Sequence, residues 1–252
     1  MTQQQDQQPS VDPALVTVFA PTGVLRAAIN VGNPILANRN AGGDVEGVSV
    51  DLAREFGRRL GVPVDLVVFE KAAASVEAVR GERADVGFFA VDPARADGLL
   101  FTAPYVLIEG AYLVPESSPV TDNGQVDAAG HRVSVGAGSA YDLFLTRELG
   151  RAEIVRCDGA AGALAALRAG EVQVAAGIRQ VLERAAERAP GVRVLPGRFM
   201  VIQQAMGVPA GRGPEAQALL AAFVERAKST GFVAAALARH RIEGGTVAPA
   251  AG

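Results

Sequence analysis

The chain has 252 residues, with 24 Lys and Arg against 27 Asp and Glu and a net charge of -3 at pH 7. This balance excludes the strongly basic surface of a nucleic-acid-binding protein, so we expect no nucleic-acid partner. Apolar residues make up 49% of the chain and charged residues 20%, which excludes general disorder. The length suits one large domain or two compact lobes.

Residues that bind metals or form disulfides are scarce in the sequence. Cys157 is the only cysteine, which excludes an internal disulfide. His131 and His240 are the only histidines, so we expect no metal site and no other cofactor.

Both ends of the sequence are irregular in composition. Residues 1–10 are polar, carry no basic residue and are not followed by the apolar run of a signal peptide. We expect residues 1–23 to be a disordered leader and the Ala-, Gly- and Pro-rich residues 244–252 to be a flexible tail. No stretch approaches the roughly 18 consecutive apolar residues that span a bilayer, so we expect no membrane insertion.

Apolar β-branched runs alternate with helical patterns in the first half of the chain. The expected order is strand 25–31, loop 32–44, helix 51–60, strand 64–69, helix 73–80 and strand 85–90. In the first helix Leu52, Phe56 and Leu60 share one face, Asp51 is the expected N-cap and Gly61 the terminator. Strands that alternate with helices predict an α/β fold with a mostly parallel sheet.

The second half repeats this order. We expect strands 132–135, 152–155, 172–176 and 201–208 and helices 139–149, 160–169, 180–188, 214–229 and 232–241. Arg80-Gly81-Glu82 precedes one strand and Arg168-Ala169-Gly170-Glu171 precedes another, which is a weak internal echo. This echo favours two similar α/β lobes over a single sheet.

Short motifs in a fixed order carry a resemblance. They are Leu25-Arg26, Glu46-Gly47-Val48-Ser49-Val50-Asp51-Leu52-Ala53, Asp92-Pro93-Ala94-Arg95 with Phe101-Thr102-Ala103-Pro104-Tyr105, and Gly136-Ala137-Gly138-Ser139-Ala140-Tyr141. With them the chain resembles the bacterial extracellular solute-binding proteins of family 3, the amino-acid-type binding proteins of ABC importers. The resemblance spans about residues 25 to 241.

The resemblance implies a two-lobed, type II periplasmic-binding-protein-like fold of the Venus flytrap kind. Lobe 1 would comprise residues 24–108 plus 206–243, and lobe 2 residues 109–205. The chain would cross between the lobes near residues 107–112 and 202–206, which would form the hinge. A ligand would bind in the cleft between the lobes, and closure would exclude water.

Arg95 is the leading candidate for a ligand-binding residue. In the family the arginine of this motif holds the ligand's carboxylate, and a guanidinium offers parallel donors to both oxygens. The alternative is an ordinary surface arginine paired with Asp92 or Asp97. Ser139 is expected to cap the helix that follows it, where free N–H groups also suit an anion.

Further candidates rest on the same resemblance. These residues are Asn30, Asn33, Phe69, Phe88, Ala90, Ala140 and Tyr141. The asparagines also fit a turn, and the aromatic residues also fit the core. Because side chains alternate along a strand, Phe88 and Phe89 are expected to face opposite sides.

One departure from the family concerns the ligand's charge. Amino-acid binders of the family usually carry a carboxylate after the strand that corresponds to residues 172–176, and this chain has Ile178 or Arg179 there. If Arg179 points into the cleft, the site favours an anion such as a carboxylate without an α-amine or a dicarboxylate. The alternative is that Arg179 is a solvated first residue of the charged helix 180–188.

The resemblance implies a binding protein, not an enzyme, that captures a small carboxylate-bearing ligand, works with an ABC permease and is a monomer. One alternative is a dehydratase-like enzyme on the same scaffold, for which Glu70 is the nearest general acid. Another is a cytosolic ligand sensor. The family implies a periplasmic location, whereas the lack of a recognisable signal peptide in this sequence leaves the cytoplasm open.

Overall fold

Short apolar strands and amphipathic helices alternate along residues 11–252, the part of the chain that this computed structural model describes. The strands are β1 Leu25–Asn30, β2 Asn38–Arg39, β3 Val45–Glu46, β4 Val64–Phe69, β5 Val86–Ala90, β6 Leu99–Pro115, β7 Arg132–Gly136, β8 Glu153–Cys157, β9 Val174–Ile178, β10 Val192–Val194, β11 Met200–Pro209 and β12 Gly245–Val247. The helices are α1 Pro13–Phe19, α2 Val48–Leu60, α3 Ala72–Arg80, α4 Ala140–Glu148, α5 Gly159–Arg168, α6 Arg179–Arg188, α7 Gly213–Ser229 and α8 Phe232–Arg239.

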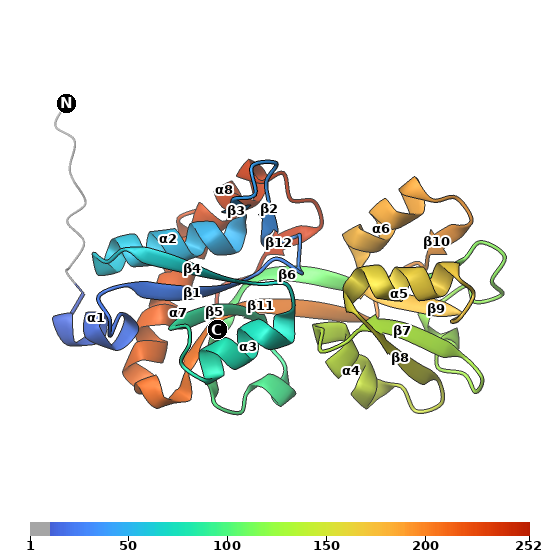
Figure 1. Ribbon diagram of the computed structural model, residues 1–252, viewed down its shortest axis with the longest axis horizontal. Helices are drawn as coiled ribbons and strands as arrows, with labels where there is room; N and C mark the ends of the chain where they lie inside the picture. Colours follow the sequence, from blue (N-terminus) through green and yellow to red (C-terminus); the bar gives the residue numbers. More distant parts are fainter. Residues whose placement is uncertain (1–10) are drawn as a thin grey trace.

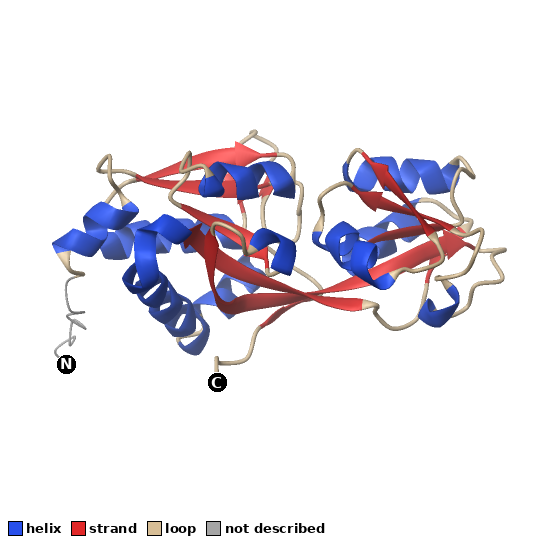
Figure 2. Ribbon diagram, turned by 90° about the horizontal axis from the view of Figure 1, so that it is seen from below, coloured by secondary structure: helices blue, strands red, loops and turns tan. Residues whose placement is uncertain are grey.

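The main sheet has the order β4-β1-β5-β11-β6-β9-β7-β8. At one end β1 pairs in parallel with β4 and β5, and at the other end β7 pairs in parallel with β8 and β9. The long antiparallel strands β6 and β11 connect these parts. Figures 1 and 2 show the result, two lobes of strands and helices with β6 and β11 running from one to the other. The predicted two-lobed α/β fold is confirmed.

The expected crossings of the chain between the lobes lie side by side. Ile202 of β11 is opposite Ile108 of β6, and Gln204 is opposite Val106. The register shifts next to Gln204, at an irregularity in the pairing. Bulges of this kind bend and twist a strand pair, which suits a place where the lobes meet. The residue limits of the lobes stay a prediction.

Helix α2 shows how the sequence shapes the first lobe. Leu52, Phe56 and Leu60 form the buried face as expected, and Gly61 ends the helix in the left-handed conformation. The predicted N-cap at Asp51 is wrong, because α2 begins at Val48 after Gly47. A Cβ on Gly47 would lie 2.3 Å from the Leu36 carbonyl oxygen, so glycine allows the chain to pass closely there just before the helix begins.

The chain ends differ from the sequence-based expectation. Within the leader expected over residues 1–23, Asp12 caps helix α1, and Phe19 packs edge-to-face on Phe56 with ring centroids 4.9 Å apart. Residues 1–10 lie outside the described part of the chain. Within the tail expected over residues 244–252, β12 pairs with β6, and Lys228 Nζ donates to the Pro249 carbonyl. Composition alone does not reveal these long-range contacts.

Membrane-spanning elements are not found among the described residues. In residues 11–252, no helix combines the length and the apolar character needed to cross a bilayer.

Candidate functional site

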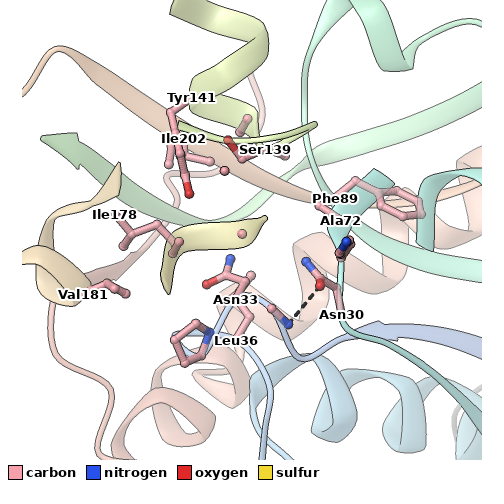
Figure 3. Close-up of a pocket in the computed structure, with 18 of the residues that line it drawn as sticks. Asn30, Asn33, Leu36, Ala72, Phe89, Ser139, Tyr141, Ile178, Val181 and Ile202 are labelled. Carbon is pink, nitrogen blue, oxygen red and sulfur yellow. Dashed lines mark hydrogen bonds between the residues drawn. The ribbon is translucent and has the colours of Figure 1, made fainter. Parts of the chain in front are cut away.

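A cavity of about 380 Å³ lies where the carboxyl ends of β1, β5 and β9 meet the first turns of α3, α4 and α5. Its walls are mostly apolar. Figure 3 shows side chains around it, with Ser139 and Tyr141 on one side and Asn30 and Asn33 on the other. Of the predicted ligand-binding residues, the cavity brings together Asn30, Asn33, Phe88, Ala90, Arg95, Ser139, Ala140 and Tyr141. Phe69 and Arg179 do not line it.

Arg95 ends a short 3₁₀ turn, Pro93–Arg95, directly after β5. The residue is only 5% exposed, and its guanidinium donates to the carbonyls of Ala90 (Nη1–O 3.3 Å) and Gly138 (Nη2–O 3.0 Å). Within residues 11–252 it forms no ion pair with a carboxylate. Burial lowers the pKa of Arg95 from its ordinary value, and the charge of Asp92 opposes that shift. An arginine remains charged in proteins, so this wall presents a buried cation without a carboxylate partner.

Asp92 does not serve as the ion-pair partner of Arg95 that the surface-arginine alternative requires. Its carboxylate caps the turn by accepting from the Ala94 amide at 2.9 Å. Both of its oxygens also accept from Arg147 of α4, at 3.2 and 2.8 Å. The Asp92 side chain is 4% exposed, so this pair joins α4 to the turn after β5 and leaves the Arg95 guanidinium to the cavity.

The start of α4 forms another part of the cavity. The expected cap at Ser139 is confirmed, because its Oγ accepts from the Asp142 amide at 3.1 Å. Asp142 Oδ2 in turn accepts from the Gly138 amide at 2.8 Å, which closes a reciprocal cap. Ala140 and Tyr141 follow in the first turn, and burial raises the pKa of the Tyr141 phenol.

Gly138 brings this turn close to the opposite lobe. Its φ is +70°, and a Cβ there would lie 3.0 Å from the Cβ of Ala73 in α3. Glycine is therefore required both by the backbone conformation and by the approach of the lobes.

Asn30 and Asn33 act as turn residues and also line the cavity. Asn30 Oδ1 accepts from the Gly32 amide at 3.0 Å (Figure 3), and Asn33 Oδ1 accepts from the Ile35 amide at 3.3 Å. Each side-chain oxygen is thereby held by the backbone. The NH₂ groups of both amides remain as donors.

The end of β5 supplies Phe88 and Ala90. The rings of Phe88 and Phe89 belong to different packing clusters, with Phe88 edge-to-face on Tyr105 at 6.2 Å and Phe89 edge-to-face on Phe101 at 6.1 Å. The predicted alternation is confirmed. Both phenylalanines reach the cavity wall. Phe69 instead packs, half-buried, on the cluster that contains Phe89.

Arg179 lies outside the cavity, where it is bound to β6 and to the segment before β11. Its Nε donates to Glu109 of β6 at 2.8 Å, and Nη2 donates to the Gly197 carbonyl. The preceding residue, Ile178, lines the cavity instead. The chain leaves β9 at Ile178 and enters α6 at Arg179, so neighbouring side chains take different directions.

Some cavity residues were missed by the sequence-based prediction. Gln204 of β11 is 4% exposed and lines the cavity, and within residues 11–252 its side-chain amide has no hydrogen-bond partner. The sequence pattern that could have predicted a buried glutamine is the Gln203-Gln204 pair in the apolar segment 201–208. Side chains alternate along a strand, so one of the two glutamines points inward. At the mouth, Lys71 pairs with Asp158 at 2.6 Å, and Glu70 pairs with Arg39 at 3.2 Å.

Solved structures similar to this chain share its fold. A mutant of the arginine-binding protein from T. maritima has 18% identity and a TM-score of 0.76, over 91% of this chain and 100% of that chain. An L-cysteine receptor of Neisseria gonorrhoeae has 24% identity and a TM-score of 0.76, over 89% of this chain and 92% of that chain. An ancestral amino-acid-binding protein, described as a precursor of cyclohexadienyl dehydratase, has 18% identity and a TM-score of 0.75, over 90% and 99%.

Sequence comparison identifies the family. No curated protein matches the chain. The model of the bacterial extracellular solute-binding proteins, family 3, matches residues 25–240, which is most of the length. The chain therefore belongs to the bacterial extracellular solute-binding proteins of family 3.

Proposed function

We propose that this solute-binding protein captures a small carboxylate-bearing solute between its lobes and that Arg95 holds the carboxylate. The observation that carries the proposal is the buried Arg95 guanidinium, which lines the cavity and has no carboxylate partner within residues 11–252. A buried cation without a counter-charge is costly, and an entering carboxylate removes that cost. Hydrogen bonds between charged groups contribute about 1.5–3 kcal/mol each.

The proposed site uses groups from both lobes. The start of α4 lies on one side of the cavity and the end of β5 with its turn on the other. A ligand that touches both sides stabilises the closed arrangement, because it binds that arrangement better than an open one. Reversible capture needs no chemical step.

The proposal is tested by identifying what the purified protein carries. The full-length protein is denatured, and the small molecules that it releases are identified by mass spectrometry. An organic acid is expected among them. A panel of carboxylic and amino acids is then screened by thermal shift, and the hits are titrated by calorimetry.

The matched variants are Arg95→Gln and Arg58→Gln. Arg58 lies on the surface of α2 and pairs with Glu55, away from the cavity. We expect Arg95→Gln to weaken the best hit by about tenfold to a hundredfold, which corresponds to the loss of about 1.5–3 kcal/mol. Arg58→Gln is expected to bind as the wild type does. Equal binding by Arg95→Gln, or no hit in the whole panel, contradicts the proposal.

Catalysis is the less favoured function on this scaffold. A dehydration step needs a general acid held against the substrate. Glu70 is the candidate at the cavity mouth, but its side chain is 70% exposed and paired with Arg39. We therefore propose a binding protein without enzymatic activity, and turnover of prephenate or arogenate by the purified protein would contradict this.

The family description also bears on location and partners. Because the family is described as extracellular, we propose that the protein works outside the cytoplasm as a monomer that delivers its solute to an ABC permease. Fractionation of the native host tests this location, and recovery of the protein in the cytosol would favour the sensor alternative.

A further inference from the structure

Two basic and two acidic residues line the cavity, and their pairing leaves Arg95 as the one without a charged partner in residues 11–252. They are Glu70, Lys71, Arg95 and Asp158. Lys71 and Asp158 neutralise each other, and Glu70 is neutralised by Arg39 outside the lining. Only Arg95 has no oppositely charged partner in residues 11–252. Asp92, whose charge acts on Arg95, has both oxygens bound to Arg147.

The free hydrogen-bonding groups around the cavity are mainly donors. The side-chain oxygens of Asn30 and Asn33 are occupied by backbone amides, so both residues offer NH₂ groups. The carbonyls of Ala90 and Gly138 already accept from Arg95. Gln204 offers a side-chain carbonyl oxygen, which is a neutral acceptor.

The rest of the wall is apolar. It includes Pro34, Leu36, Phe88, Ile178, Val181 and Ile202. Ile178 lies on the wall formed by β9 and α6 (Figure 3) and presents an aliphatic side chain to the cavity. These side chains suit a hydrocarbon body and carry no negative charge for a cation.

From this arrangement we infer that the ligand is a carboxylic acid without an amino group, whose carboxylate meets Arg95 and whose apolar body packs on Ile178 and its neighbours. The inference rests on the proposed capture of a carboxylate and narrows the class of solute. A monoanion balances the charge of Arg95. A zwitterion brings in an ammonium group that needs an anionic partner, and the two acidic residues of the lining, Glu70 and Asp158, lie exposed in ion pairs with Arg39 and Lys71.

The test uses pairs of compounds that differ only in the amino group. Suitable pairs are L-leucine with 4-methylpentanoate and L-phenylalanine with 3-phenylpropanoate, each titrated calorimetrically into the full-length protein after removal of bound solute. We expect the acid without the amino group to bind at least tenfold more tightly in any pair that binds. If the amino acid binds equally or more tightly, this inference is overturned, while capture of a carboxylate still stands. If no member of any pair binds, the inference and the proposed function both fail for solutes of this size.

A pair of variants provides an independent readout. Ile178→Asp adds a carboxylate to the cavity wall, and Ile178→Asn adds a neutral group of the same shape. We expect Ile178→Asp to prefer the amino acid of a pair. The ratio of its affinity for the amino acid to that for the acid without the amino group should be at least tenfold higher than in Ile178→Asn, because only the aspartate provides a counter-charge for an ammonium. Thermal unfolding shows whether both variants are folded. An unchanged preference in a folded Ile178→Asp protein overturns the inference.

Discussion

Arg95 donates a hydrogen bond to the carbonyl of Gly138 across the cleft, with 3.0 Å between Nη2 and the oxygen. The candidate carboxylate-binding residue therefore also contacts the turn that begins α4 on the opposite wall. The Asp92–Arg147 pair lies beside it and joins the same two elements. Ligand capture and lobe closure thus depend on one small region.

Gly138→Ala is expected to weaken ligand binding through closure. The left-handed conformation costs an alanine about 1–2 kcal/mol, and the new Cβ would meet Ala73 at 3.0 Å when the lobes approach. Gly170→Ala is the control, because Gly170 has φ +71° with no atom within 4 Å of its Cβ position. Calorimetric unfolding should show similar losses of stability in both variants, and titration should show weaker binding only in Gly138→Ala. Equal affinities in the two variants would contradict a role of this contact in closure.

Arg147→Gln is expected to lower ligand affinity although Arg147 does not line the cavity. The variant removes the partner of the buried Asp92 carboxylate in the closed arrangement, and an open cleft would expose that carboxylate to water. A loss of about 1 kcal/mol, or roughly fivefold in affinity, is expected. Arg156→Gln serves as the control, since Arg156 pairs with Asp142 within the lobe that contains α4. The idea fails if both variants bind as tightly as the wild type.

Gln204→Leu tests whether the unpartnered amide on β11 contacts the solute. Loss of a hydrogen bond to a bound solute would reduce affinity by about 1 kcal/mol. Gln203→Leu changes the adjacent residue, which is exposed and does not line the cavity. Titration of both variants with the solute recovered from the protein is the measurement. Weakening in Gln203→Leu alone would exclude contact by Gln204.

Acid is expected to destabilise the protein in part through Glu109 of β6. Hydrogen bonds from Arg198 and Arg179 lower the pKa of this carboxyl below its ordinary value, against the opposing effect of burial. A lowered folded-state pKa means that the ionised carboxylate stabilises the fold above its ordinary pKa and that this contribution is lost as pH falls through the folded-state pKa. Melting temperatures measured from about pH 7 to about pH 3 should fall less steeply in Glu109→Gln than in the wild type. Identical slopes would show that the ionised Glu109 carboxylate contributes nothing to the stability of the fold.

Local sequence signals predicted the parts of the site that depend on short-range structure. Ser139 follows glycines and precedes Asp142 by three residues, and this spacing defines the cap that starts α4. The alternation of Phe88 and Phe89 follows from strand geometry in the same way. Such features are determined within a few residues of chain.

Features that depend on distant partners were not predicted. The direction of Arg179 is determined by Glu109, which lies 70 positions earlier in the sequence. Lys71 and Asp158 become neighbours only when the lobes meet. Helix α1 owes its place to the packing of Phe19 on Phe56, which composition does not reveal.

The pairing of β12 with β6 has a consequence for the molecule's tendency to self-associate. Gly245–Val247 covers the backbone of residues 106–108 where β6 passes between the lobes. Without that short strand, a row of N–H and C=O groups would lie open on a sheet edge, and such edges recruit strands from other molecules. Deletion of residues 245–252 should therefore produce dimers or aggregates at raised concentration, even if the truncated protein still binds its solute.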